Sequence, residues 1–297
     1  MAFFFEVLIG GLLAGVMYSL VALGFVLIYK ASGVFNFAQG AMVFFAALTY
    51  VSLIELGWHW ALVLPATLAV MVMLGVLTEK IVLRPLVNQP QITLFMATIG
   101  LTFFIEGFSQ LIWGSQPHGL ELGIEDIPIE WAMANLNLNI SQLDLFAAVI
   151  AGALVAGLAL FFQYTRIGRA LRAVADDHQA AMAVGIPLKN IWAIVWAVAG
   201  FVALVAGLMW GARNGVQYAL TFIALKALPV LILGGFESVL GAIVGGLIIG
   251  ASEKLAEVYI GPYFGGGVES WFAYVIALLF LLFRPQGLFG EKIIDRV

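Results

Sequence analysis

The sequence predicts an all-α polytopic membrane protein with about eight or nine transmembrane helices, some of them short, broken or re-entrant. Two observations lead to this fold class. Hydrophobic residues make up 63% of the 297 residues and charged residues only 10%, whereas a soluble domain carries roughly a quarter charged residues. Apolar stretches also recur at the length of about 20 residues that a helix needs to cross a bilayer. A soluble enzyme, a nucleic-acid-binding protein and a disordered linker are therefore excluded.

Six segments before residue 213 are long enough to span. They are, in chain order, residues 7–29, 33–54, 58–78, 92–113, 145–164 and 191–212. Some of them are uncharged throughout, and others contain polar or ionisable residues. The segment at 33–54 reaches spanning length only when Asn36 and Gln39 are counted, and the segment at 92–113 contains Glu106. We read residues 7–29 as a permanent helix, because they are too long for the apolar part of a cleavable signal.

Three later segments are harder to assign. Residues 219–236 contain Lys226 and Pro229, residues 238–252 are short and rich in glycine, and residues 265–283 reach spanning length only with Glu269 included. Each could be a span, a broken helix or a re-entrant turn, since non-helical backbone at membrane depth is tolerated where protein or a water-filled cavity satisfies it.

Basic residues predict the orientation of the chain. Positively charged side chains concentrate in cytoplasmic loops, and ten of the 13 Lys and Arg residues lie in alternate connections: Lys30, Lys80, Arg84, Arg166, Arg169, Arg172, Lys189, Arg284, Lys292 and Arg296. The connections between these, residues 55–57 and 115–144, contain no Lys or Arg. We therefore expect the N-terminus outside, the C-terminus in the cytoplasm, and nine crossings if all three late segments cross.

Small residues recur within the predicted spans. Gly11 and Gly15 form a GxxxG pair, and two more pairs follow at Gly241 with Gly245 and at Gly246 with Gly250. Such spacing lets helix backbones approach closely in lipid. We expect these pairs to serve packing within the chain, with a dimer seam as the alternative.

Four polar side chains fall inside predicted spans, where they are costly and commonly functional. They are Asn36, Gln39, Glu106 and Lys226. Their functional interpretation is a polar lining for a translocation path, and the alternative is hydrogen bonding between helices. We expect a broken or tightly packed entry at Asn36 and Gln39, a polar partner or an interfacial position for Glu106, and an interfacial charge for Lys226 if its segment is re-entrant.

The sequence gives no indication of catalysis or of a bound metal. It contains no cysteine, its formal net charge is −4, and its three histidines are far apart at His59, His118 and His178. Protease and hydrolase motifs are absent. We therefore predict no catalytic residue, no metal site, no bound cofactor and no nucleic-acid partner.

Residues 165–187 form the most distinctive connection. Asp176 and Gln179 have the spacing of a capping box, good helix formers follow, and Gly185 with Pro187 indicates a helix end. A short helix over residues 177–184 is predicted. Since a helix of about two turns is unstable alone in water, and its acidic start disfavours an anionic lipid surface, we expect it to dock on a cytoplasmic partner.

Four segments together resemble ABC importer permeases of the branched-chain amino acid (Liv) family. They are IGRALRAVADDHQAAMAVGI at 167–186, the segment ending in NFAQG at 11–40, LGGFESVLGAIVGG at 233–246 and FRPQGLFG at 283–290. Their order along the chain also agrees, and the similarity is closest to the LivH-type permease. One departure is Glu237, which stands where the family block usually has glycine.

The resemblance implies one transmembrane permease domain, residues 1–297, in the inner membrane, with a periplasmic N-terminus. It implies a second permease subunit, two ATPase subunits that use ATP, and a periplasmic substrate-binding protein. The cytoplasmic coupling loop would be residues 165–187, with Arg169, Asp177, Ala181, Met182 and Gly185 as coupling residues. No lysine follows a glycine, so a Walker A loop is absent and the motor must be separate.

The resemblance leaves the substrate open. A branched-chain amino acid is the first expectation, and urea or short amides are alternatives within the same family. The residues alone leave two other classes of membrane protein as alternatives. A stand-alone secondary transporter would need an intramembrane carboxylate relay, and a channel would need a filter-like segment.

Overall fold

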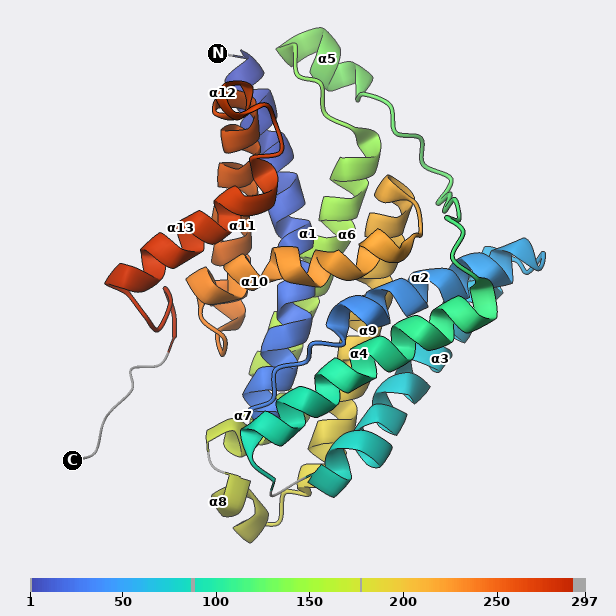
Figure 1. The fold of residues 1–297 in the computed structure, drawn as a ribbon, viewed down its shortest axis with the longest axis vertical. Coiled ribbons are helices and arrows are strands. Elements are labelled where there is room, and N and C mark those ends of the chain that lie inside the picture. The colour runs from blue at the N-terminus through green and yellow to red at the C-terminus, as the bar shows by residue number, and fades with distance from the viewer. Residues whose placement is uncertain (1, 87–88, 177, 291–297) are drawn as a thin grey trace. The chain divides into compact units, whose positions relative to one another are not determined.

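The computed structural model describes residues 2–86, 89–176 and 178–290. These residues form helices without a β-strand among them, and the long connection at 114–129 is non-helical (Figure 1). The elements are α1 (Ala2–Ser32), α2 (Gln39–Glu55), α3 (Trp60–Leu77), η1 (Thr78–Leu83), η2 (Arg84–Leu86), α4 (Gln91–Trp113), α5 (Glu130–Leu136), α6 (Gln142–Tyr164), α7 (Arg166–Asp176), α8 (His178–Ala183), α9 (Leu188–Asn214), η3 (Tyr218–Phe222), α10 (Ile223–Gly234), α11 (Val239–Tyr259), α12 (Gly261–Phe264) and α13 (Glu269–Phe283). The predicted all-α class is confirmed.

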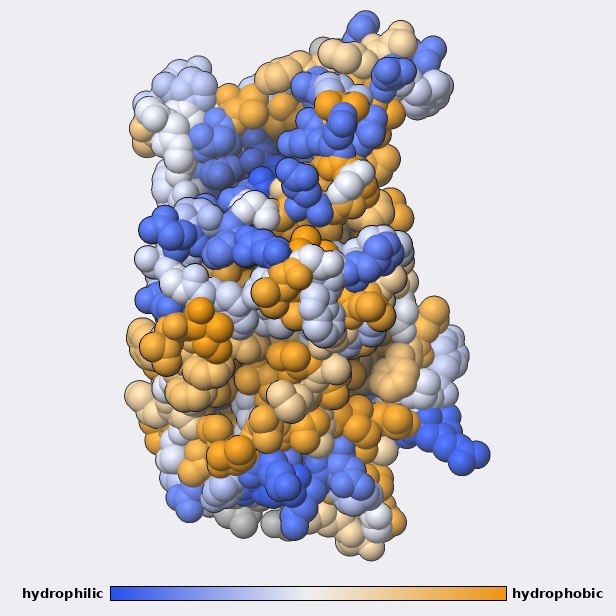
Figure 2. Space-filling view, turned by 90° about the vertical axis from the view of Figure 1, so that its right-hand side faces the viewer, coloured by the Kyte–Doolittle hydropathy of each residue, from blue (hydrophilic) through white to orange (hydrophobic). Residues whose placement is uncertain are grey.

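Six helices among the described residues are long and apolar enough to cross a membrane: Ala2–Ser32, Trp60–Leu86, Gln91–Trp113, Gln142–Tyr164, Leu188–Asn214 and Val239–Tyr259. Three shorter apolar helices are Gln39–Glu55, Tyr218–Gly234 and Glu269–Phe283. Hydrophobic side chains cover broad areas of the face in Figure 2, as a lipid-facing surface requires. The polytopic membrane architecture is therefore confirmed.

The chain divides into two compact units. Unit 1 comprises residues 1–23, 121–155 and 225–297, and unit 2 comprises residues 24–120 and 156–224. Each is described by itself below. The prediction of a single permease domain stays a prediction.

In unit 2, α2 packs against α3, α4, α9 and η3, and α3 also packs against α9 (Figure 1). Glycines permit these close contacts. A Cβ at Gly207 of α9 would lie 2.6 Å from the Val43 carbonyl oxygen of α2, and one at Gly200 would lie 2.6 Å from the Met71 carbonyl oxygen of α3. Both positions must therefore lack a side chain for α9 to approach α2 and α3.

In unit 1, the GxxxG pairs of α1 and α11 contact each other. A Cβ at Gly11 would lie 2.7 Å from the Gly250 carbonyl oxygen, and one at Gly15 would lie 2.5 Å from the Gly246 carbonyl oxygen. On a second face of α11, Gly245 packs against α10. A Cβ at Gly245 would lie 2.7 Å from the Val230 carbonyl oxygen. These pairs therefore serve packing within the chain, which was the favoured prediction.

Helix α11 is longer than the predicted segment at residues 238–252. It starts after Ser238, whose Oγ accepts a hydrogen bond from the Gly241 N–H at 2.9 Å, and it continues to Tyr259. The prediction ended where charged residues begin, because an unpaired charge in lipid is costly. The charges beyond Ser252 are paired within unit 1, so they do not end the helix.

Two segments that carry the family resemblance meet at the end of α10. The backbone N–H groups of Leu288 and Phe289 donate to the carbonyls of Leu233 and Gly234 at 2.8 and 3.1 Å. Gly235 has φ of +104°, a conformation that suits glycine. Glu237 has no positive φ, so the absence of glycine there causes no backbone strain.

Candidate functional site

The connection between α1 and α2 is a helix break built around Asn36. Gly33, with φ of +67°, ends α1. The Asn36 Oδ1 accepts a hydrogen bond from the Ala38 N–H at 3.1 Å, and its Nδ2 donates to Gln39 Oε1 at 3.1 Å. Asn36 and Gln39 are both 0% exposed. The predicted broken entry is present, and the two amides that were predicted together do contact each other.

Gly24 of α1 lies against this amide pair, and stacked phenylalanines lie beside it in the sequence. A Cβ at Gly24 would lie 2.5 Å from Gln39 Nε2, so the Gln39 amide fills the space beside α1 that a side chain would occupy. Gln39 Nε2 has no hydrogen-bond partner among the described residues. The Phe35 ring stacks on Phe25 with centroids 4.8 Å apart and contacts Phe37 at 4.6 Å. In this conformation the Gln39 donor is therefore closed off from solvent.

Glu106 lies in the middle of α4 and is 8% exposed. Its Oε2 accepts a hydrogen bond from the Tyr218 hydroxyl of η3 at 3.2 Å. Tyr218 also lies edge-on to Phe44 of α2, with centroids 6.4 Å apart. The contact therefore ties α4 to η3 and α2 and gives Glu106 a polar partner, but among the described residues it adds no second carboxylate for a proton relay.

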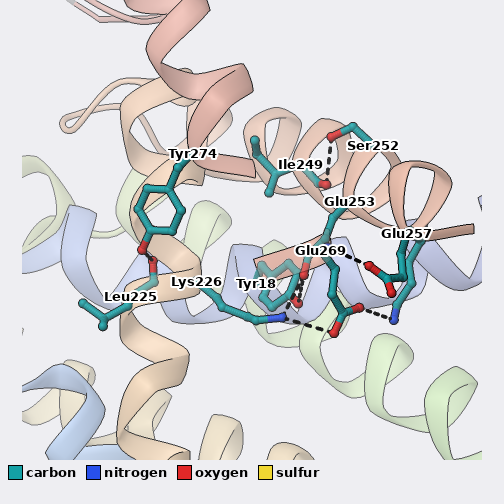
Figure 3. Close-up of polar contacts among 10 residues, drawn as sticks. Tyr18, Leu225, Lys226, Ile249, Ser252, Glu253, Glu257, Glu269 and Tyr274 are labelled. Atoms are coloured by element: carbon teal, nitrogen blue, oxygen red, sulfur yellow. Dashed lines mark hydrogen bonds and ion pairs between the residues drawn. The ribbon is translucent and has the colours of Figure 1, made fainter. Parts of the chain in front are cut away.

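Lys226 of α10 is paired inside unit 1 (Figure 3). Its Nζ donates to Glu253 Oε1 of α11 at 2.8 Å and lies 3.8 Å from Glu269 Oε1 of α13. The Tyr18 hydroxyl of α1 donates to the same Glu253 oxygen at 3.3 Å. The Glu253 side chain is only 3% exposed, whereas that of Lys226 is 34% exposed. Pairing with Glu253, and not extension toward an interface, therefore holds the Lys226 charge.

The outer part of this cluster is formed at the start of α13. Lys254 Nζ donates to Glu269 Oε2 at 2.9 Å. The two oxygens of Glu257 accept hydrogen bonds from the backbone N–H groups of Gly267 and Glu269 at 3.0 and 2.8 Å. Glu257 thus satisfies N–H groups that the first turn of α13 leaves without helical partners. Lys226, Tyr18, Glu253, Glu269 and Lys254 are called the Lys226 cluster below.

The predicted coupling loop folds as α7 and α8 in unit 2. Thr165 Oγ1 accepts a hydrogen bond from the Gly168 N–H at 3.0 Å and so caps α7. Arg172 donates to the carbonyls of Phe162 and Gln163 at the end of α6, and Arg169 donates to the Tyr164 carbonyl at 3.4 Å. Both arginines complement the negative end of α6. Arg169 therefore has a local capping contact in addition to its predicted coupling role.

Helix α8 ends as the sequence predicts. The Gly185 N–H donates to the Met182 carbonyl at 3.0 Å, the Ile186 N–H donates to the Ala181 carbonyl at 3.0 Å, and Gly185 has φ of +87°. This is the Schellman arrangement of a helix end. Asp177, at the predicted start, lies outside the described residues.

The apolar side chains in and after α8 differ in exposure, whereas the prediction placed them on one surface. Ala181 is 3% exposed, whereas Met182 is 51% and Val184 77% exposed. The predicted apolar ridge joined alanine, methionine and valine in one docking surface. Since Ala181 faces the chain's own interior, the exposed apolar surface consists of Met182 and its exposed neighbours.

A pocket of about 510 Å³ adjoins the end of α8. Its walls include Met182, Pro187 and Lys189, and also the ion pair between Glu79 and Arg84. Arg84 Nε and Nη2 donate to Glu79 Oε1 and Oε2 at 2.9 and 2.6 Å, and Glu79 is 0% exposed. The pair fixes the connection after α3 beside the coupling loop.

Sequence reasoning missed Glu253 and Glu79 as buried acidic residues. A signal for Glu253 existed, because it follows Gly246 and Gly250 at helical spacing and so shares the face of α11 that packs on α1. Glu79 had a basic residue five positions later. No group of three or more His, Asp or Glu side chains in the described part of the chain is placed to hold a metal ion.

The four polar residues predicted for a path are divided between the units. Asn36, Gln39 and Glu106 belong to unit 2, and Lys226 belongs to unit 1. None of these groups is arranged as nucleophile and base. They can provide amide and ammonium donors and a carboxylate acceptor to a polar solute, which is the chemistry of binding or passage.

Comparison with known proteins finds relatives that match most of the chain. A family model described as "Branched-chain amino acid transport system / permease component" matches residues 7–284. The high-affinity branched-chain amino acid transport system permease protein LivH of Salmonella typhimurium is 26% identical, over 99% of this chain and 98% of that protein. The high-affinity branched-chain amino acid transport system permease protein BraD of Pseudomonas aeruginosa is 28% identical, also over 99% of this chain and 98% of that protein.

A solved structure described as PsaBC from Streptococcus pneumoniae in complex with Fab is also similar. It covers 92% of this chain and 89% of its own, with a TM-score of 0.46 and 12% sequence identity.

Proposed function

Because the chain belongs to the family of permease components of branched-chain amino acid transport systems, we propose that it forms the membrane path for branched-chain amino acids in an ABC importer. The chain is a multi-pass transport permease. The observation that carries the proposal is the family match over residues 7–284, in a chain that also places a capped, partly exposed helix in its longest basic connection.

Energy for transport comes from partner subunits in this proposal. Two ATPase subunits bind and hydrolyse ATP, a second permease subunit completes the path, and a periplasmic binding protein delivers the substrate. The chain lies in a bacterial inner membrane with a periplasmic N-terminus and a cytoplasmic C-terminus. The basic residues Arg166, Arg169 and Arg172 beside α8 support this orientation.

Helix α8 is the proposed contact with an ATPase subunit. Met182 and Val184 supply the exposed apolar surface, and the Schellman end at Gly185 joins that surface through Pro187 directly to α9. Since α9 packs on α2 and α3, movement of α8 is transmitted to the helices that hold the Asn36 break.

The test of function is uptake by vesicles that contain all subunits. We expect leucine to accumulate only with ATP and the binding protein. Uptake of urea or a short amide, with none of leucine, would contradict the proposed substrate. Accumulation of solute by the purified chain alone, driven by an ion gradient, would contradict the ABC mechanism altogether.

The docking role of α8 has its own test. Met182→Asp places a charge on the exposed apolar surface, so we expect recovery of the ATPase by pull-down to fall by about tenfold, equivalent to about 1.4 kcal/mol. Met133→Asp is the matched control for an added charge at an exposed methionine, because Met133 of α5 is also 51% exposed and lies outside the predicted spans. Equal recovery with Met182→Asp and the unchanged chain would exclude this docking surface.

A further inference from the structure

We propose that Lys226 binds the carboxylate of the transported amino acid and thereby makes the permease prefer amino acids to amides, which lack a carboxylate. This inference rests on the proposed function and adds the residue that determines specificity. It is drawn from the geometry of the Lys226 cluster, which lies wholly within unit 1 (Figure 3).

The first step is that Lys226 has donor capacity left. An ammonium group has three N–H donors. Among the described residues, Glu253 alone lies within hydrogen-bond distance of Lys226 Nζ, at 2.8 Å, because Glu269 is 3.8 Å away. The Lys226 side chain is 34% exposed. A solute carboxylate could therefore bind the ammonium without displacing Glu253.

The second step is that Lys226 is held in place before a ligand arrives. Glu253 is buried, and the oxygen that pairs with Lys226 also accepts a hydrogen bond from the Tyr18 hydroxyl at 3.3 Å. The Lys226 ammonium also lies 6.0 Å from the centre of the Tyr18 ring, within the range of a cation–π contact. A flexible side chain that is already oriented loses less entropy when it binds a ligand.

The third step is the charge balance around the site. Lys226 and Lys254 carry two positive charges, against the two negative charges of Glu253 and Glu269. The neighbouring Glu257 carboxylate, which is bound by backbone N–H groups, adds a third negative charge. A free anion would add net negative charge to this surrounding, whereas a zwitterionic amino acid adds none. The site therefore fits a zwitterion better than a simple carboxylate ion.

The absence of cysteine from the chain permits a chemical test in the complete transporter. Lys226→Cys should lower leucine uptake by about tenfold to a hundredfold, the range for loss of a hydrogen bond between charged groups. Treatment with 2-aminoethyl methanethiosulfonate attaches an ammonium group to the cysteine and should restore much of the uptake. Methyl methanethiosulfonate attaches a neutral group and should not.

Two controls separate recognition from assembly. The unchanged chain, treated with both reagents in the same complex, reports any effect on cysteines of the partner subunits. The double variant Lys226→Met/Glu253→Gln removes both charges of the ion pair and leaves no unpaired buried charge. It should therefore assemble even if Lys226→Cys does not. In this variant, we expect leucine uptake relative to leucinamide uptake to fall by about tenfold.

The outcomes distinguish this inference from the proposed function. If the unchanged transporter does not accumulate leucine, the proposed function is wrong. If it does, but the double variant keeps the original KM for leucine and the original preference over leucinamide, Lys226 does not bind the carboxylate. Equal rescue by the charged and the neutral reagent would also overturn the inference.

Discussion

Units 1 and 2 accommodate polar groups within apolar helices in opposite ways. In unit 2, the chain leaves the helical conformation between α1 and α2, and uncharged amides of Asn36 and Gln39 satisfy part of the break. In unit 1, α11 continues unbroken past Ser252, and the polar groups are charges paired between α10, α11 and α13. In unit 1 the partners come from different helices, whereas the amides that satisfy the break in unit 2 lie three residues apart.

The largest expected effect concerns the charged arrangement. Lys226→Met leaves Glu253 buried without its cation, and we expect a loss of about 3–5 kcal/mol, the range for breaking a buried ion pair. Glu253→Gln leaves a lysine that is one-third exposed and should cost less than half as much. The thermal unfolding of the complex in detergent measures both. Equal losses would mean that the burial of Glu253 does not decide the cost.

A smaller effect is expected at the amide break. Asn36→Leu removes the acceptor of the Ala38 N–H and the donor to Gln39, so a loss of about 2 kcal/mol is expected from the buried groups left unpaired. Gln39→Leu should cost less than about 1 kcal/mol, since the Asn36 bond to Ala38 remains. Uptake per folded transporter should fall in both if these amides line the path. Unaltered uptake would make them structural, and the same unfolding assay would rank their costs.

The smallest effect compares two tyrosines that donate to buried carboxylates. Tyr218→Phe removes the hydrogen bond to Glu106, and the described residues offer Glu106 no other donor. Tyr18→Phe removes one donor from Glu253, which keeps Lys226. We expect losses of about 1–2 kcal/mol for Tyr218→Phe and below about 1 kcal/mol for Tyr18→Phe. A larger loss for Tyr18→Phe would contradict the view that Lys226 contributes more than Tyr18 to holding Glu253.

Much of the fold follows from the sequence, because span length and apolar composition act locally. The ends of α4 and α6 lie within three residues of their predicted positions, and the Gly185 stop follows from backbone preference. The pairing of Glu253 with Lys226 could not be predicted, since the two residues are 27 positions apart and meet only through tertiary contacts. For the same reason the burial of Ala181 was missed: helix propensity does not say which face of a short helix packs inward.

The hydrogen bonds from Leu288 and Phe289 to the carbonyls of Leu233 and Gly234 have a consequence for biosynthesis. A ribosome makes residues 233–234 well before residues 288–289, so these two carbonyls lack their final partners while α11 and α13 are being inserted. The end of α10 therefore reaches its final hydrogen bonding only after α13 has been synthesised. The FRPQGLFG segment stabilises an earlier part of the chain late in biosynthesis.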